Sequence, residues 1–347
     1  MPQTPKSGSS AASPTLADVS KRAGVSTATV SRCLNSPAQV SQATREKVMQ
    51  AVKELGYAPN FGAQALAAKR TNTFGAIVPT LENAIFANGL QAFQENLGKQ
   101  GITLLVASSS YSREMEEEQI RNLVARGADA LLLIGYDRTA DSYEFLERRG
   151  IPYVIAWAFD AADARISVGF DNQRAMRQLA DKVLDFGHKN LAMISAHRKG
   201  NDRARLRFQG VRDAMIARGL EPDQLAVVEA PYSFTRGSAA FADLMQRVPR
   251  PTAVICGNDV LATGAVKMAQ EMGLRVPEDV SITGFDNIEL AEIVTPGLTT
   301  VDVPHREMGL RAAEVLMQMR QEDSEGESQE LSTGVKIRAS LGPVPKV

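Results

Sequence analysis

The sequence is poor in the residues that form disulfides and metal sites. Among its 347 residues there are two cysteines, Cys33 and Cys256, and three histidines, His188, His197 and His305. Two distant cysteines do not suggest a disulfide framework, and the scattered histidines do not have the spacing of metal ligands, so we expect no metal. No apolar run approaches the roughly 18 residues that a membrane-spanning helix needs. We therefore expect a cytoplasmic protein without a membrane partner.

Signatures of common enzyme classes are also missing. The sequence contains no G-x-G-x-x-G, no G-x-x-x-x-G-K-[ST] and no G-x-S-x-G pattern. These patterns bind dinucleotides, cradle phosphates or carry a catalytic serine. We therefore expect no cofactor, no catalytic residues and no enzymatic activity.

The net charge is only −1, but positive charge is gathered near the N-terminus. Residues 1–70 carry nine Lys or Arg against three acidic residues, whereas the remainder carries 30 basic and 37 acidic residues. This asymmetry favours a basic part that meets nucleic acid and an acidic body that does not. The polar residues 1–14 are predicted to form a flexible tail.

Residues 15–59 are predicted to form three short helices around one small core. Thr15 stands three residues before an aspartate, which predicts a capped helix start, and Gly24 predicts the end of that helix. Ser26 predicts the cap of a second helix after a turn of about three residues, the spacing of a DNA-binding helix-turn-helix. Ser41 predicts the start of the third helix. A capped helical hairpin without DNA function would show the same local signals.

The segment TLADVSKRAGVSTATVSRCLN, residues 15–35, resembles the headpiece of the lactose-repressor (LacI) family of bacterial transcription regulators. The likeness continues through VSQATREKV and ELGYAPN. It implies that Thr27, Ala28 and Arg32 face the DNA major groove, with Arg32 providing most hydrogen bonds to bases because the other two side chains are short. It further implies phosphate contacts by the hydroxyl and amide side chains of Thr15, Ser26, Thr29, Ser31, Asn35, Ser41 and Thr44.

Residues 60–72 form either an interdomain linker or, by the same resemblance, a hinge helix. In that family the hinge helix folds when two copies meet in the DNA minor groove. Leu66 would be the apolar wedge between two base steps. The side chains that would lie near the DNA backbone are Asn60, Gln64 and Lys69.

Residues 73–347 alternate apolar runs with helical stretches, the pattern of a parallel α/β fold. The resemblance implies a Rossmann-like, periplasmic-binding-protein-like body of two lobes, about 73–170 plus 303–345 and about 171–300. Crossings between the lobes are expected near residues 170–172, 285–287 and 296–303. The predicted strands are 74–78, 102–107, 130–134, 153–157, 191–195, 252–256, 280–285 and about 331–340.

In such folds a ligand lies at the C-terminal ends of the strands, between the lobes. Carboxylate, amide and guanidinium groups beside aromatic rings suit a polyhydroxy ligand. Asp259 is expected to cap a helix rather than bind. The candidate effector residues, from their place after strands and from the family's motifs, are Ile85, Phe86, Trp157, Asp171, Arg207, Asn258 and Asp286, with Tyr232 or Phe234 as a lid.

The sequence therefore predicts a transcription regulator, most simply a repressor, that binds a near-palindromic double-stranded DNA operator as a homodimer. A sugar, a sugar acid or a phosphorylated derivative would control it. The segment ISVGFDN resembles the gluconate-operon repressor branch of the family, which favours a sugar acid. The alternative is a solute-binding protein or sensor, which would not need residues 15–70.

Overall fold

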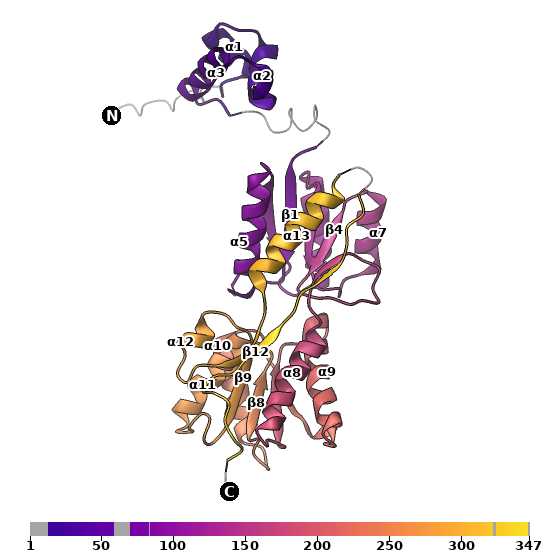
Figure 1. The fold of residues 1–347 in the computed structure, drawn as a ribbon, viewed down its shortest axis with the longest axis vertical. Helices are drawn as coiled ribbons and strands as arrows, with labels where there is room; N and C mark the ends of the chain where they lie inside the picture. The colour runs from indigo at the N-terminus through magenta and orange to yellow at the C-terminus, as the bar shows by residue number, and fades with distance from the viewer. Residues whose placement is uncertain (1–12, 59–69, 83, 322–323, 346–347) are drawn as a thin grey trace, which may run out of the picture. The chain divides into compact units, whose positions relative to one another are not determined.

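The computed structural model describes residues 13–58, 70–82, 84–321 and 324–345. The chain divides into two compact units, Met1–Thr71 and Asn72–Val347, called here the headpiece and the body (Figure 1). The predictions for Asn60, Gln64, Leu66 and Lys69, and for the side chain of Asn35, lie outside what the structure describes.

The headpiece contains three helices, α1 (Leu16–Ala23), α2 (Thr27–Asn35) and α3 (Gln42–Leu55), and a 3-10 turn at Pro37–Gln39. Thr15 caps α1 as predicted: its hydroxyl accepts from the backbone N–H of Asp18, and the Asp18 carboxylate accepts from the backbone N–H of Thr15. α1 ends at Gly24, whose φ of 67° is easily adopted by glycine.

The headpiece core lies where the apolar faces of its three helices meet. Val19, Val30 and Val48 are fully buried, in agreement with the helical spacing of the sequence. Cys33 and Ala51 complete the buried set, and Leu16, Val52 and Leu55 pack around it. A core this small supports three short helices that would be marginal in isolation.

The body is built on two six-stranded sheets, ordered β11-β5-β4-β3-β1-β2 in the first lobe and β12-β10-β9-β8-β6-β7 in the second. All neighbouring strands pair in parallel except β10 and β12. The first sheet consists of β1 (Thr73–Val78), β2 (Thr103–Ser108), β3 (Ala130–Ile134), β4 (Tyr153–Ala156), β5 (Ser167–Gly169) and β11 (Gln329–Glu330). The second consists of β6 (Leu191–Ser195), β7 (Ala226–Glu229), β8 (Ala253–Cys256), β9 (Ser281–Asp286), β10 (Thr299–Asp302) and β12 (Gly334–Lys336).

Helices cover the sheets of both lobes. The first lobe has α5 (Ala84–Lys99), α6 (Arg113–Ala125), α7 (Ala140–Arg148) and α13 (His305–Met319). The second has α8 (Asn172–Asp185), α9 (Asp202–Ala217), α10 (Phe234–Met245), α11 (Asp259–Glu271) and α12 (Leu290–Ile293), with a 3-10 turn at Pro222–Gln224. None of the described helices is long and apolar enough to cross a membrane.

The alternation of side chains along each strand assigns the helices to the two faces of the sheets. In β1, Phe74 and Val78 belong to the core that includes α5 and α13, whereas Ile77 belongs to the core formed with α6 and α7. In β6, Met193 packs toward α8 and α9 and Ile194 toward α10 and α11. Both sheets are thus covered on both faces, which explains why their strands read as continuous apolar runs.

The chain passes between the lobes after β5, after β10 and between β11 and β12. The crossing expected near 285–287 was wrong. The carboxylate of Asp259 accepts from the Ile288 backbone N–H at 2.9 Å and from the Thr300 hydroxyl at 2.6 Å, and so keeps this segment in the second lobe.

The expected assignment of residues 303–345 to the first lobe also needs correction. α13 and β11 belong there, but β12 and the residues after it return to the second lobe. Ser340 donates to the Ile282 carbonyl at 2.6 Å, and a ring nitrogen of His188 bonds the Gly342 carbonyl at 2.9 Å. The last strand was also expected at about 331–340, where the described residues form only the short strand β12; β11 ends just before this range and belongs to the other sheet.

Candidate functional site

A small cavity, called here the inner cavity, lies where the two lobes meet. Its volume is about 20 Å³, and its wall combines aromatic rings, two guanidinium groups and one carboxylate. The residues that line it are Ile85, Phe86, Tyr111, Trp157, Asn201, Arg203, Arg207, Tyr232 and Asp286. Six of these, all except Tyr111, Asn201 and Arg203, are among the candidate effector residues of the sequence.

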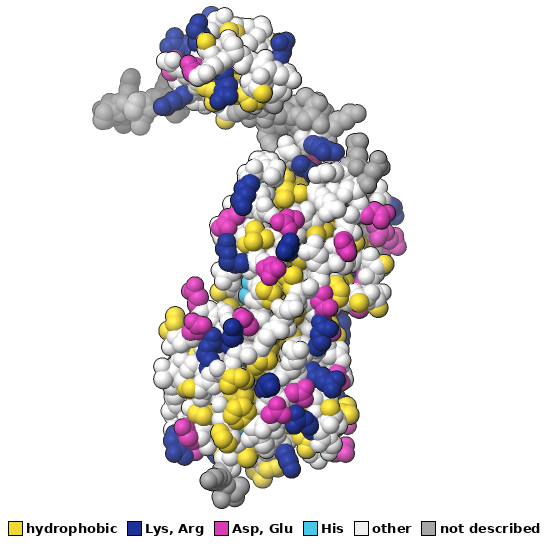
Figure 2. Space-filling model, viewed as in Figure 1, with side chains coloured by type: hydrophobic (Ala, Val, Ile, Leu, Met, Phe, Trp, Pro, Cys, Tyr) yellow, Lys and Arg dark blue, Asp and Glu magenta, His cyan; other side chains and the backbone are white. Residues whose placement is uncertain are grey.

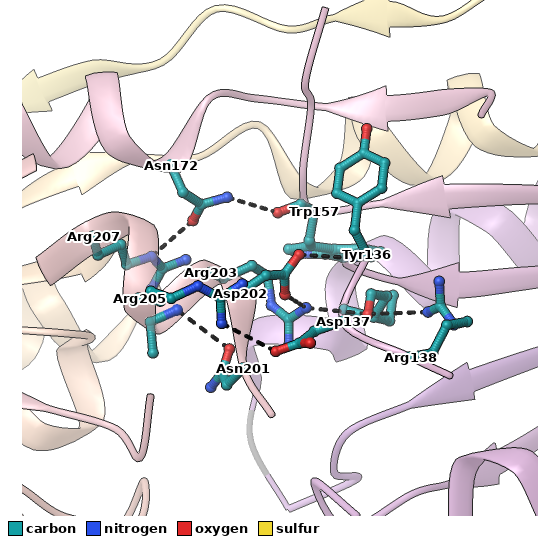
Figure 3. A network of polar contacts seen from close by, with 12 residues as sticks. Tyr136, Asp137, Arg138, Trp157, Asn172, Asn201, Asp202, Arg203, Arg205 and Arg207 are labelled. Atoms are coloured by element: carbon teal, nitrogen blue, oxygen red, sulfur yellow. Dashed lines mark hydrogen bonds and ion pairs between the residues drawn. The ribbon is translucent and has the colours of Figure 1, made fainter. Parts of the chain in front are cut away.

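Arg207 lies on α9, and two of its three guanidinium nitrogens are hydrogen-bonded within the protein. Its Nε donates to Asn172 Oδ1 at 2.8 Å and its Nη1 to the Gly257 carbonyl at 2.7 Å (Figure 3 shows the Asn172 bond). The guanidinium carbon lies 3.6 Å from the centre of the Phe285 ring, which supports its face. Nη2, 3.6 Å from Asp286 Oδ1, is the donor group that these bonds leave for a ligand.

Asp286 places a carboxylate in the wall of the inner cavity. The residue is 1% exposed, and neither carboxylate oxygen has a hydrogen-bond partner among the described residues. Burial raises the pKa of Asp286 to about 7, although Arg207 and Arg203 act in the opposite direction. A buried carboxylate without a donor is costly, so this group is suited to accept hydrogen bonds from a ligand.

The aromatic side of the inner cavity is formed by Trp157 and Phe86. Their ring centroids are 5.4 Å apart in an edge-to-face arrangement, and Trp157 is 1% exposed. Trp157 has a φ of 59°, and Asp286 has a φ of 106°, backbone conformations that non-glycine residues adopt rarely. Such strain is concentrated at functional sites because only the surrounding structure maintains it.

Two tyrosines separate the inner cavity from a larger one. Tyr111 follows β2 in the first lobe and Tyr232 follows β7 in the second, with ring centroids 5.8 Å apart. Both also line an outer cleft of about 590 Å³. Burial raises the pKa of both hydroxyls, so both are neutral at physiological pH. The outer cleft has the volume of a small-molecule site, whereas the inner cavity must widen to hold a sugar.

Three candidate effector residues lie elsewhere. Asp171 caps α8, accepting from the Arg174 backbone N–H at 2.9 Å, and does not line either cavity. Phe234, at the start of α10, is 47% exposed, so of the two possible lids only Tyr232 borders the cavity. Asn258 caps α11 through Oδ1, while its buried Nδ2 has no hydrogen-bond partner among the described residues.

The prediction that Asp259 caps a helix was wrong. The cap of α11 is Asn258, and Asp259 instead bonds to Ile288 and Thr300. Burial raises the pKa of its carboxyl to about 8. Asp259 therefore serves the packing of the second lobe.

Sequence reasoning missed residues that complete the site or support it. Tyr111 follows a strand, which is a usable signal. Arg203 can be interpreted from the sequence either as solvated or as adding positive field for an acidic effector, and it lines the inner cavity. Asn172 follows a predicted strand, but its role could not be predicted because its partner is distant in the sequence: it accepts from Arg207. His305 carries no such signal and accepts from Trp157.

The surface of α2 in the headpiece carries the predicted DNA-reading residues. Thr27, Ala28 and Arg32 are exposed, and the Arg32 side chain makes no hydrogen bond or ion pair to the described residues. Figure 2 shows further Lys and Arg side chains over the visible face of the headpiece. An exposed arginine beside short side chains at the start of a helix is suited to approach a base edge.

The hydroxyl groups predicted to hold phosphates mostly bond to one another at helix starts. Ser26 accepts from the Thr29 backbone N–H at 3.1 Å, and the two hydroxyl oxygens are 2.9 Å apart. Ser41 and Thr44 form the same hydroxyl pair at 2.9 Å, although Ser41 does not cap α3 through its side chain. Each pair uses one hydroxyl hydrogen and leaves one that can be donated to phosphate.

Residues 15–60 match the family described as bacterial regulatory proteins, lacI family, and residues 180–341 match the periplasmic binding protein-like domain. The HTH-type transcriptional regulator GntR of Pseudomonas aeruginosa is 35% identical over 305 residues, 88% of each chain. The lac repressor dimer bound to operator and the anti-inducer ONPF aligns with a TM-score of 0.83 and 28% identity over 95% of this chain and 99% of that one. A complex of the regulator CelR with cellobiose aligns with a TM-score of 0.70 and 30% identity over 94% and 99%. The chain therefore belongs to the lacI family of bacterial DNA-binding transcription regulators.

Proposed function

We propose that this regulator represses transcription and that a sugar or sugar acid, bound at the inner cavity, sets its affinity for operator DNA. The observation that carries the proposal is the pairing of an unsatisfied buried carboxylate, Asp286, with the held guanidinium of Arg207 against an indole wall. The relatives add support, because the similar regulator CelR was solved with cellobiose.

The chemistry of the wall matches a polyhydroxy ligand. Asp286 accepts hydroxyl hydrogens from the ligand, and Nη2 of Arg207 donates to a hydroxyl or carboxylate oxygen beside it. Trp157 and Phe86 offer apolar surface to the C–H groups of the ligand. Because the pKa of Asp286 is about 7, the carboxyl can also donate when it is protonated.

A ligand between lobes can control DNA binding only if it favours one arrangement of the lobes. The two lobes are joined by three crossing segments, so each can turn as a unit while the crossings absorb the change. We propose that a homodimer places two headpieces on a near-palindromic operator, because one recognition helix reads only one half-site. Asn60, Gln64, Leu66 and Lys69 remain the proposed hinge contacts to DNA, as Asn35 remains a proposed phosphate contact.

A thermal-shift panel tests the effector proposal directly. We expect a sugar acid or a sugar to raise the melting temperature of the wild-type protein, because a ligand at 100 times its Kd stabilises by about 2.7 kcal/mol. Asp286→Asn should lose the shift. Asp171→Asn is the matched control, since it changes an aspartate that caps a helix outside the cavity, and it should keep the shift.

The same ligand must then change the affinity of the protein for operator DNA, measured by fluorescence anisotropy with labelled duplex. If no sugar, sugar acid or sugar phosphate shifts the melting temperature, the effector proposal is wrong. A ligand that shifts the melting temperature equally in Asp286→Asn would show that the site lies elsewhere.

A further inference from the structure

The loop after β3 in the first lobe is fastened to the start of α9 in the second (Figure 3). The backbone N–H of Tyr136 donates to Asp202 Oδ2 at 2.6 Å. Nη1 of Arg203 donates to the Ile134 carbonyl at 3.1 Å and to Asp202 Oδ1 at 3.0 Å. These residues, together with Gly135, are called here the latch.

The latch is buried, unlike the pair of Arg205 and Asp137 beside it. Asp202 is 4% exposed and Arg203 8% exposed, so their charges interact in a medium of low dielectric. The neighbouring pair of Arg205 and Asp137 also joins the lobes, at 3.1 Å, but the Arg205 side chain is 53% exposed and this pair contributes little.

Gly135 is the residue of the first lobe that makes room for the latch. Its φ of 69° is left-handed, and a β-carbon at this position would overlap both the Arg203 guanidinium and the Asp202 carboxylate. Gly150, also in the first lobe, has a φ of 60°, but a β-carbon there would meet no atom within 4 Å. The two glycines therefore share the backbone requirement and differ in what surrounds them.

The latch contacts also determine which charged groups line the inner cavity. Arg203 lines the cavity, whereas Asp202 does not, because both of its oxygens are turned to Tyr136 and Arg203. Nε and Nη2 of Arg203 make no hydrogen bond to the described residues. Two guanidinium groups and a single carboxylate thus face a ligand.

We propose that Arg203 makes the site selective for an anionic ligand, a sugar acid or sugar phosphate, and that Gly135 and Asp202 are positioning residues that fix its guanidinium at the cavity. Nη1 of Arg203 is held by Asp202 of its own lobe and by the Ile134 carbonyl of the first lobe, so both bonds are made only when the lobes are together. Anion binding at this guanidinium is therefore coupled to lobe closure. This inference rests on the proposed function of the inner cavity.

Gluconate and glucitol are the probes that test the charge selectivity. They share a carbon chain and differ only in that gluconate has a carboxylate where glucitol has a hydroxymethyl group. Trp157, the single tryptophan of the sequence, lines the cavity and reports binding by its fluorescence. We expect the wild-type protein to bind gluconate at least about tenfold more tightly than glucitol, because charged hydrogen bonds are the stronger ones. Arg203→Gln should bring the ratio of the two dissociation constants close to one, and Arg203→Lys should restore part of it.

In Gly135→Ala the added methyl group displaces the Arg203 guanidinium from the side of the first lobe, so the ratio of the two dissociation constants should also fall. Gly150→Ala should leave this ratio at the wild-type value. A purely structural defect would weaken both ligands equally and leave the ratio unchanged, which would overturn the positioning role. A wild-type ratio near one, with both ligands bound, would overturn the charge selectivity and leave the proposed function intact. If neither gluconate nor glucose 6-phosphate binds while a neutral sugar does, the charge selectivity fails and the proposed function stands; if no ligand of the thermal-shift panel binds, both fail.

Melting temperatures of all variants establish first that each is folded. Should Arg203→Gln not fold, Gly135→Ala and Gly150→Ala decide the question alone, because neither removes a charge.

Discussion

The indole Nε1–H of Trp157 donates to Nδ1 of His305 across 3.1 Å, which fixes the imidazole as the tautomer protonated on Nε2. Nε2 lies 3.1 Å from the Asp286 carbonyl and donates to it. Trp157 and His305 belong to the first lobe and Asp286 to the second. One imidazole thus connects the aromatic wall of the inner cavity with the strand end that bears its carboxylate.

This connection requires a neutral His305 and predicts a response to acid. Burial lowers the pKa of His305 to about 4. Between pH 6.5 and 4 the unfolded chain therefore binds a proton that the folded protein does not, so stability is lost as the pH falls through this window. We expect Trp157 emission to change with a midpoint near pH 4, and His305→Gln to remove the transition.

His197→Gln is the control, because the His197 side chain is 63% exposed and should not influence Trp157. Far-ultraviolet circular dichroism at each pH separates the local change from unfolding. A midpoint near 6.5 would show that the hydrogen bond does not hold His305 in its neutral form.

The raised pKa of Asp286 predicts that stability depends on pH in the opposite direction. Its pKa is raised to about 7, so from about pH 4 to 7 the folded protein retains a proton that the unfolded chain has released. Stability due to this group falls as the pH rises through that window, by at most about 1.4 kcal/mol per pH unit. Denaturant unfolding between pH 5 and 8 should show a smaller decline in Asp286→Asn than in the wild type. Equal slopes would mean that Asp286 is ionised throughout.

Arg32 is predicted to read a base rather than support the headpiece. Its side chain is exposed and makes no hydrogen bond within the described residues, so Arg32→Ala should leave the headpiece folded. We expect a loss of about 1–3 kcal/mol on the operator and relaxed preference at one base position. Lys53→Ala removes an equal charge from α3 and should weaken operator and random DNA alike. A loss for Arg32→Ala that is the same on both DNAs would assign it to phosphate.

Thr15 is predicted to act through the helix it caps. In Thr15→Ala the Asp18 backbone N–H loses its side-chain acceptor and the Asp18 carboxylate loses the hydroxyl, which should cost about 1 kcal/mol. Amide hydrogen exchange of α1 in the full chain measures this loss, and Thr15→Ser should reverse it. If Thr15→Ala leaves the hydrogen-exchange protection of α1 unchanged, the hydroxyl does not stabilise the helix and a phosphate contact explains its presence instead. In the free protein the Thr15 hydroxyl donates to Asp18 at 2.7 Å.

The part of the fold that could be predicted from sequence is the part with local signals. The long strands were found because both faces of each sheet are covered and the strands read as apolar runs. β5 and β12, three residues each, carry no such signal, and α13 was not predicted at all. The return of residues 334–345 to the second lobe depends on distant bonds, such as that of Ser340 with Ile282, that no local pattern reveals.

The residues of the candidate site also divide into those with a local sequence signal and those without one. Residues at the ends of predicted strands, such as Asp286, were found because the strand ends converge. Asp171 has the same placement, but its carboxylate is used by α8 as a helix cap. The supporting bond from Trp157 to His305 spans 148 residues of sequence, and only the folded chain brings its partners together.

The chain passes between the lobes three times, and this affects the order in which the lobes can fold during synthesis. Residues 73–169 can form every strand of the first sheet except β11, and residues 172–302 every strand of the second except β12. α13, which covers the face of the first sheet beside Trp157, is made only afterwards, and β11 and β12 follow it. A nascent chain that has reached residue 302 therefore carries two nearly assembled sheets with an uncovered apolar face, and both lobes are completed together by the same late segment.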